Sequence, residues 1–131
     1  MIVDLNELNI DSLSHQLLSK KDIKHDLENN PFGKCIFYVE NNEIIAYLYY
    51  SDIYERAEIN QIEVKEKHRN CGIGTKLLEH LIKNVEKNIT LEVKKDNYPA
   101  IKIYKKQGFK ECAIRKGYYN GVDAILMERK I

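Results

Sequence analysis

The sequence contains no tryptophan, only two prolines and only three cysteines among its 131 residues. Cys35, Cys71 and Cys112 are widely spaced, and neither a CxxC pair nor a Cys/His pair with zinc-finger spacing occurs. So sparse and odd a set of cysteines argues against a disulfide framework and against a structural zinc site. We therefore expect three reduced thiols, as in a cytosolic protein.

An excess of charge of one sign and long apolar runs are also missing. Lys and Arg number 21 against 20 Asp and Glu, which leaves a net charge of +1. This balance argues against a protein whose main partner is nucleic acid. No stretch approaches the roughly 18 apolar residues of a membrane span. The N-terminus lacks the basic start and apolar run of a signal peptide. We expect a cytoplasmic protein without a membrane partner and, because its histidines share no spacing with carboxylates, without a metal.

What the chain does have is the composition of an ordinary globular protein, with 44% hydrophobic and 31% charged residues. Its length predicts one domain over residues 1–131, large enough to bury a core without disulfides or metals. In the first half we predict a strand over 2–5, a helix over 11–29 and a hairpin of strands 35–40 and 43–51 that turns at Asn41-Asn42.

The predicted strand over residues 57–65 carries an irregular pattern. Ile62 and Val64 share one face, whereas Ile59 has the opposite parity. A β-bulge near Asn60-Gln61 would reconcile the two sets, and bulges often lie beside functional sites.

The second half predicts helices and strands in alternation. An apolar helical face follows Gly74, a strand spans 89–94, and a helix begins at Asn97 and ends at Gly108. Strands over 109–115 and 124–130, joined by a loop over 116–123, close the chain. A strand–helix–strand unit implies a right-handed parallel crossover. The sequence thus predicts a single α/β domain with a mixed, mostly antiparallel sheet.

Gly72 and Gly74 precede the first of these helices. Glycine lets a ligand approach the main chain, and the free amides and dipole of a helix start attract an anion. A Walker loop is excluded because no Gly-Lys-Ser/Thr follows. A dinucleotide fingerprint is disfavoured because Leu77 replaces its third glycine and the preceding loop is long and polar. A plain structural turn remains the alternative.

The wider pattern is similar to that of GNAT N-acetyltransferases. Arg69-Asn-Cys-Gly72-Ile-Gly74 resembles the Q/R-x-x-G-x-G/A signature of that family, and LEV (91–93), Asn97, AIKIYKKQGF (100–109) and YYNGVDAILM (118–127) follow in the family's order. The run most resembles the RimI-type enzymes, which acetylate the N-terminal alanine of a small-subunit ribosomal protein. The first 30 residues depart from that type and lack its Pro-Trp-Ser element. The resemblance implies the GNAT fold and acetyl-CoA as co-substrate.

The resemblance also implies a cofactor site. The pyrophosphate of acetyl-CoA would bind the amides of Asn70, Cys71, Gly72, Ile73, Gly74 and Thr75. The pantetheine arm would pair like a strand with Ile62, Glu63 and Val64, and Asn97 would contact the cofactor besides capping its helix. An N–H near Val64 would steady the oxyanion of the intermediate.

The same resemblance assigns Glu92 as general base, with Glu58 as the reserve, and Tyr104 as general acid. A phenol stays protonated at neutral pH because its pKa is about 10. Tyr118 and Tyr119 would border the acceptor peptide. A covalent route through Cys71 is disfavoured because Cys71 would face the pyrophosphate rather than the thioester.

We expect a protein N-terminus, such as that of a ribosomal protein, as the acceptor, and a monomer or weak dimer. Two alternatives stay open: a GNAT enzyme for a small amine or a lysine side chain, and a silent acyl-CoA-binding module.

Overall fold

A computed structural model describes residues 1–4, 27 and 29–131. In chain order its elements are β1 (Ile2–Asp4), β2 (Gly33–Glu40), β3 (Glu43–Asp52), β4 (Arg56–Val64), the short 3-10 helix η4 (Glu66–His68), α2 (Ile73–Asn84), β5 (Asn88–Lys94), α3 (Tyr98–Lys106), β6 (Lys110–Tyr119) and β7 (Val122–Arg129). The predicted strand over 2–5 appears as β1. The helix expected over residues 11–29 lies almost wholly outside the described residues.

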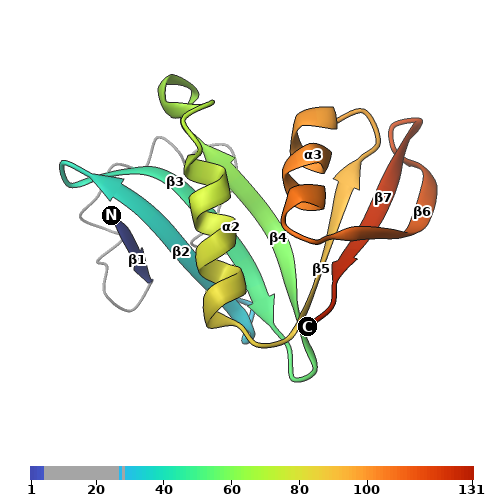
Figure 1. The fold of residues 1–131 in the computed structure, drawn as a ribbon, viewed down its shortest axis with the longest axis horizontal. Coiled ribbons are helices and arrows are strands. Elements are labelled where there is room, and N and C mark those ends of the chain that lie inside the picture. The colour runs from blue at the N-terminus through green and yellow to red at the C-terminus, as the bar shows by residue number, and fades with distance from the viewer. Residues whose placement is uncertain (5–26, 28) are drawn as a thin grey trace.

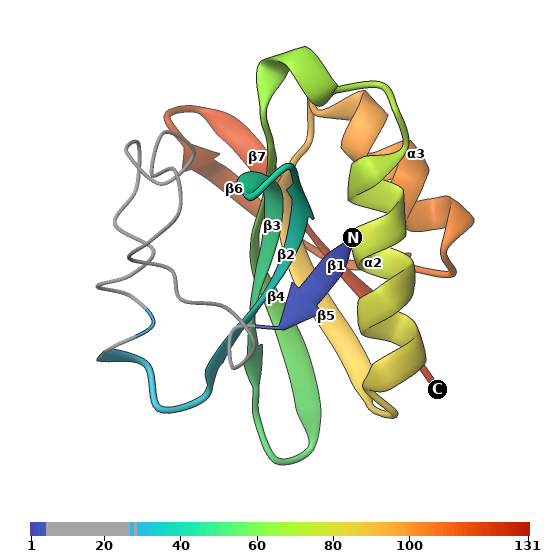
Figure 2. The same ribbon diagram turned by 90° about the vertical axis from the view of Figure 1, so that its left-hand side faces the viewer.

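Seven strands form one sheet in the order β1-β2-β3-β4-β5-β7-β6 (Figure 1). β4 and β5 run parallel, and every other neighbouring pair is antiparallel. The mixed, mostly antiparallel sheet and the crossover through α2 are therefore confirmed. Figure 2 shows α2 and α3 on the same face of the sheet. This face will be called the helix face.

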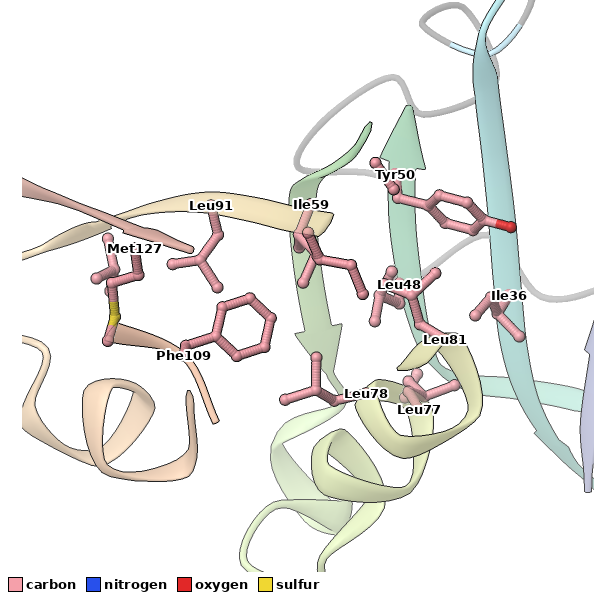
Figure 3. Close-up of a cluster of buried hydrophobic side chains, with 14 of the residues drawn as sticks. Ile36, Leu48, Tyr50, Ile59, Leu77, Leu78, Leu81, Leu91, Phe109 and Met127 are labelled. Carbon is pink, nitrogen blue, oxygen red and sulfur yellow. The ribbon is translucent and has the colours of Figure 1, made fainter. Parts of the chain in front are cut away.

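The main core lies between the sheet and the two helices. α2 buries Ile73, Leu77, Leu78 and Leu81, the face that the apolar spacing predicts. Figure 3 shows the leucines directed toward β3 and β4, while Leu91 of β5, Met127 of β7 and Phe109, just before β6, extend the cluster. Each fully buried leucine contributes about 1.5–3 kcal/mol. This packing fixes the start of α2 beside the end of β4.

The predicted bulge in β4 is confirmed. The register of β3 against β4 shifts between Tyr49 and Tyr50, and Asn60 is the extra residue. The Asn60 side-chain amide donates a hydrogen bond of 2.8 Å to the Ser51 hydroxyl on β3. The irregular parity of this strand thus marks a real break in the ladder.

The prediction of an eight-residue loop over 116–123 is wrong. β6 continues to Tyr119 and β7 begins at Val122. Only Asn120 and Gly121 form the turn, with φ of 49° and 92°. Asn-Gly suits a two-residue hairpin turn with positive φ at both positions, so the chain reverses without a longer loop. Both tyrosines of the predicted loop therefore lie on a strand.

Candidate functional site

β4 and β5 separate soon after they begin to pair. Their parallel register covers only Arg56–Ile59 against Asn88–Leu91, and beyond it the two strands diverge (Figure 1). Between them lies a cavity of about 460 Å³ that we call the β4–β5 cleft. Its lining comes from both strands, α3 and β6: Ile59, Asn60, Gln61, Ile62, Leu91, Glu92, Val93, Lys94, Asn97, Tyr104 and Tyr119.

The end of β4 presents backbone groups to this cleft. Lys65 N donates to Ile45 O of β3 at 2.8 Å, so Lys65 belongs to a hydrogen-bonded pair. Such pairs alternate along an antiparallel ladder. Glu63 therefore directs its backbone groups toward β3, whereas Ile62 and Val64 direct theirs toward the open edge. Of the three residues expected to pair with an extended ligand, Ile62 and Val64 have amides available for it.

The loop before α2 has the backbone geometry of an anion site. Asn70 and Gly72 have φ of 64° and 76°. Arg69 ties the loop to β4, because its Nε donates to Val64 O at 3.0 Å. The first helical hydrogen bond runs from Lys76 N to Gly72 O at 3.0 Å. The amides of the first turn thus have no helical acceptor and can bind an anion.

Space remains open above both glycines. A Cβ added to Gly72 would meet nothing within 4 Å among the described residues, and one added to Gly74 would meet only a Val64 methyl at 3.9 Å. Packing within the protein therefore does not require glycine at either position. The positive φ at Gly72 does favour it. Ile73 and Thr75 lie in the first turn of α2, on either side of Gly74.

Glu92 enters the cleft from the face opposite the helices. Leu91 and Val93 are buried in the core under the helix face, and side chains alternate along a strand. The Glu92 side chain is 23% exposed, and its Oε2 lies 3.3 Å from an Arg115 guanidinium nitrogen. A partly buried carboxylate in a cleft is suited to general-base chemistry.

Tyr104 reaches the same cleft from α3, on the helix face. Its ring packs against Phe109 with centroids 5.7 Å apart. Burial raises the pKa of the Tyr104 phenol above its ordinary value of 10.0. Among the described residues, no group hydrogen-bonds to its hydroxyl. The structure therefore places the Glu92 carboxylate and the Tyr104 phenol on opposite sides of one cleft.

Asn97 and Tyr119, both predicted site residues, also line the cleft, whereas Tyr118 does not. The Asn97 side chain caps α3 by accepting a hydrogen bond from Ala100 N at 3.3 Å, as expected. Tyr119 lines the cleft, whereas the neighbouring Tyr118 is 52% exposed outside it. The two tyrosine rings pack edge to face with centroids 5.0 Å apart.

The reserve base and the cysteine lie elsewhere. Glu58 pairs with Arg56 at 3.7 Å and has a side chain that is 45% exposed, and the cleft lining does not include it. Cys71 is exposed beside the glycines and is likewise absent from the lining. This arrangement favours Glu92 over Glu58 and disfavours a covalent route through Cys71.

Arg115 is the site residue that sequence reasoning missed. It lies on β6, contacts Glu92, and has its guanidinium carbon 4.5 Å from the centre of the Tyr118 ring. The sequence places Arg115 three residues before Tyr118, but the predicted loop over 116–123 put Tyr118 outside the strand of Arg115. No local pattern links β6 to β5 across β7.

A second cavity, of about 430 Å³, lies between the start of β2 and the C-terminal half of α2. Its Asp52 carboxylate contacts Lys34 at 3.0 Å and Lys87 at 2.5 Å. The hydrogen bond from Lys87 is the main cause of the lowered pKa of Asp52. These contacts tie the end of β3 to β2 and to the connection between α2 and β5.

Within residues 1–4, 27 and 29–131, no three or more His, Cys, Asp or Glu side chains gather as metal ligands. None of the helices in the same ranges is long and apolar enough to span a membrane.

The sequence profile of the acetyltransferase (GNAT) family matches residues 2–109. The chain belongs to this family. This match confirms the family resemblance predicted from the glycine signature. The cleft, the bulge and the helix start described above are therefore features of a GNAT protein. The match reaches from β1 to the end of α3 and leaves out β6 and β7.

Relatives and solved structures agree with the GNAT assignment. The chain is 42% identical to an N-alpha-acetyltransferase of Saccharolobus solfataricus over 82 residues, which cover 58% of this chain and 49% of that protein. It is 29% identical to a putative ribosomal protein bS18-alanine N-acetyltransferase of Bacillus subtilis, with 83% and 76% covered. The chain thus spans about half the length of the archaeal relative.

Two structures show the same fold. The crystal structure of the ribosomal-protein-S18-alanine N-acetyltransferase from Escherichia coli superimposes with a TM-score of 0.77 at 29% identity, covering 85% of this chain and 77% of that one. A GNAT family acetyltransferase from Elizabethkingia anophelis, solved with acetyl-CoA bound, gives a TM-score of 0.79 at 24% identity, covering 100% and 97%.

Proposed function

We propose that this protein transfers an acetyl group from acetyl-CoA to a primary amine, the N-terminal α-amine of a protein. One observation carries the proposal. Glu92 and Tyr104 enter the β4–β5 cleft from opposite faces, at the end of the sheet where α2 begins. This arrangement supports direct transfer between two substrates held together.

The cofactor would lie along the open edge of β4. Its pyrophosphate would accept hydrogen bonds from the amides between Asn70 and Thr75, and its pantetheine arm would pair with the backbone of Ile62 and Val64. Asn97 would add a contact from the other side of the cleft. This placement brings the thioester to the cleft between the two proposed catalytic side chains.

The reaction then needs two proton transfers. Glu92 accepts a proton as the amine nitrogen bonds to the thioester carbonyl carbon, and a β4 backbone N–H near Val64 donates to the oxyanion that forms. The intermediate collapses as the carbon–sulfur bond breaks. Tyr104 gives its proton to the departing sulfur. The products are the amide and the free thiol of CoA, and exchange with solvent returns a proton to Tyr104 and removes one from Glu92.

The chemistry of the base supports an α-amine as acceptor. A peptide α-amine has a pKa of about 8, so it needs only modest help from a base at neutral pH, whereas a lysine amine, near 10.4, needs more. The relatives named N-alpha-acetyltransferase and bS18-alanine N-acetyltransferase point to the same class. Tyr119 at the cleft mouth would contact the first residues of the acceptor.

The test is thiol release from acetyl-CoA across an acceptor panel. The panel contains peptides that begin with Ala, Ser or Met, a peptide with a blocked N-terminus and one internal Lys, and a polyamine. We expect release with the free N-termini and none with the blocked peptide. Release with only the lysine peptide or only the polyamine would instead assign the acceptor to a lysine side chain or to a small amine. CoA binding without any release would make the protein a silent binding module.

Glu92→Gln tests the base in the same assay. We expect turnover to fall about 100-fold or more, the usual contribution of a general base, with acetyl-CoA affinity unchanged. Glu58→Gln is the matched control, because it removes the reserve carboxylate outside the cleft. A loss confined to the Glu58 variant would reassign the base.

A further inference from the structure

Arg115 reaches Glu92 across an intervening strand. β7 lies between β5 and β6, and Ala124 of β7 is opposite both Lys94 and Arg115. Residues directly opposite in a sheet share a face, so Arg115 lies on the face of Lys94. Glu92 is two residues from Lys94 on the same strand and therefore lies on that face as well. Ala124 is fully buried, and its small side chain lets the long arginine pass over β7.

The contacts of Arg115 connect four side chains in series. Its guanidinium lies 3.3 Å from Glu92 and stacks on Tyr118, with 4.5 Å from its carbon to the ring centre. Tyr118 packs edge to face on Tyr119 at an interplanar angle of 83°. Burial raises the pKa of Tyr119, and the charge of Glu92 adds to this. The Arg115 guanidinium therefore contacts both the Glu92 carboxylate and the Tyr118 ring.

We propose that Arg115 is a positioning residue that fixes the Glu92 carboxylate at the cleft for proton transfer from the incoming amine. The proposal rests on the proposed role of Glu92 as base. Arg115 is not among the residues that line the β4–β5 cleft, so it would act through its contact with Glu92.

The energetics separate this role from a contribution to folding. The Arg115 side chain is 52% exposed, and ion pairs of this kind contribute only about 0–1 kcal/mol to stability. Misplacing a catalytic group by about 1 Å can cost about 100-fold in rate. Loss of Arg115 should therefore change turnover far more than stability.

A double-mutant cycle tests the coupling. We expect Arg115→Met to lower kcat about 10-fold or more, with the KM for acetyl-CoA unchanged, and Arg115→Lys to restore part of the loss. In a Glu92→Gln background the same substitution should change kcat by less than about 2-fold, because the group that it positions is gone. Lys116→Met is the control for simple loss of a cation, since Lys116 forms no ion pair among the described residues.

Three outcomes would overturn the proposal. Unchanged kcat in Arg115→Met would show that the contact is dispensable. Equal losses with and without Glu92 would place the effect of Arg115 elsewhere, while the function proposed above would stand. If Glu92→Gln alone keeps full turnover, the base assignment fails and this proposal fails with it. Thermal midpoints measured for every variant separate these results from unfolding.

Discussion

Replacing Tyr104 by phenylalanine removes one oxygen from the β4–β5 cleft and leaves the surrounding packing in place. The ring keeps its contact with Phe109 at 5.7 Å. Because no described residue hydrogen-bonds to the hydroxyl, its loss strands no partner. The free energy of unfolding should therefore change by less than about 0.5 kcal/mol. Acetyl-CoA affinity should also persist.

The effect on turnover follows from the leaving group. A general acid contributes about 10²–10⁴-fold, and a thiol, whose pKa is about 8.5, leaves readily enough to need the lower end of that range. We expect kcat to fall about 100-fold in Tyr104→Phe, which equals about 2.7 kcal/mol in the barrier.

Thiol release at saturating acetyl-CoA and acceptor measures this, with calorimetry for cofactor affinity. Because burial raises the pKa of Tyr104 above 10.0, the acid stays protonated as pH rises. Wild-type turnover should therefore increase from pH 7 to 9 as the acceptor amine, with a pKa of about 8, loses its proton. Full turnover in Tyr104→Phe would refute the acid assignment. Equal losses of affinity and turnover would mean that Tyr104 acts in binding.

Three further predictions concern the helix start and stability. Gly72→Ala should weaken CoA binding about 10-fold or more by placing a methyl group against the ligand. Gly117→Ala is the control and should leave CoA binding unchanged, because Gly117 has a similar φ of 63° and equally open space. Equal effects of the two substitutions on CoA binding would indicate backbone strain alone. Saturating acetyl-CoA should slow alkylation of the exposed Cys71 and leave that of the exposed Cys112 unchanged, as mass spectrometry can quantify. The pKa of Asp52 is lowered in the folded protein, so ionised Asp52 stabilises the fold at pH values above its ordinary pKa of 3.8. This stabilisation is lost as the pH falls through the lower pKa of the folded state. The thermal midpoint of Asp52→Asn should therefore fall less than that of the wild type between pH 6 and pH 2.

The fold was predictable wherever one local rule decided it. The conflicting parity of Ile59 against Ile62 and Val64 located the bulge to within a residue, because a strand has only two faces. Asn97 marked the start of α3 for a similar reason, since its side chain caps the helix within its own turn. Local sequence thus predicted the bulge, whose residue Asn60 lines the β4–β5 cleft.

The C-terminal hairpin was harder to predict. Asn120-Gly121 is a strong turn signal, yet the polar and glycine-containing stretch around it resembled a longer loop. The extension of β6 brings Arg115 next to Glu92 through a register that involves three strands. Such a contact depends on tertiary pairing and on the small size of Ala124, and no periodicity in one segment encodes it.

The short parallel pairing of β4 with β5 has a mechanical consequence. Only the four residues Arg56–Ile59 join the two halves of the sheet by register. A cofactor bound between β4 and β5 would add hydrogen bonds beyond the point where the two strands stop pairing. It would thereby link the two halves of the sheet for as long as it is bound. Binding at 100 times the dissociation constant stabilises a fold by about 2.7 kcal/mol. Much of that protection should fall on the amides of β5 and β7, so that hydrogen exchange in the C-terminal strands reports whether the cofactor is present.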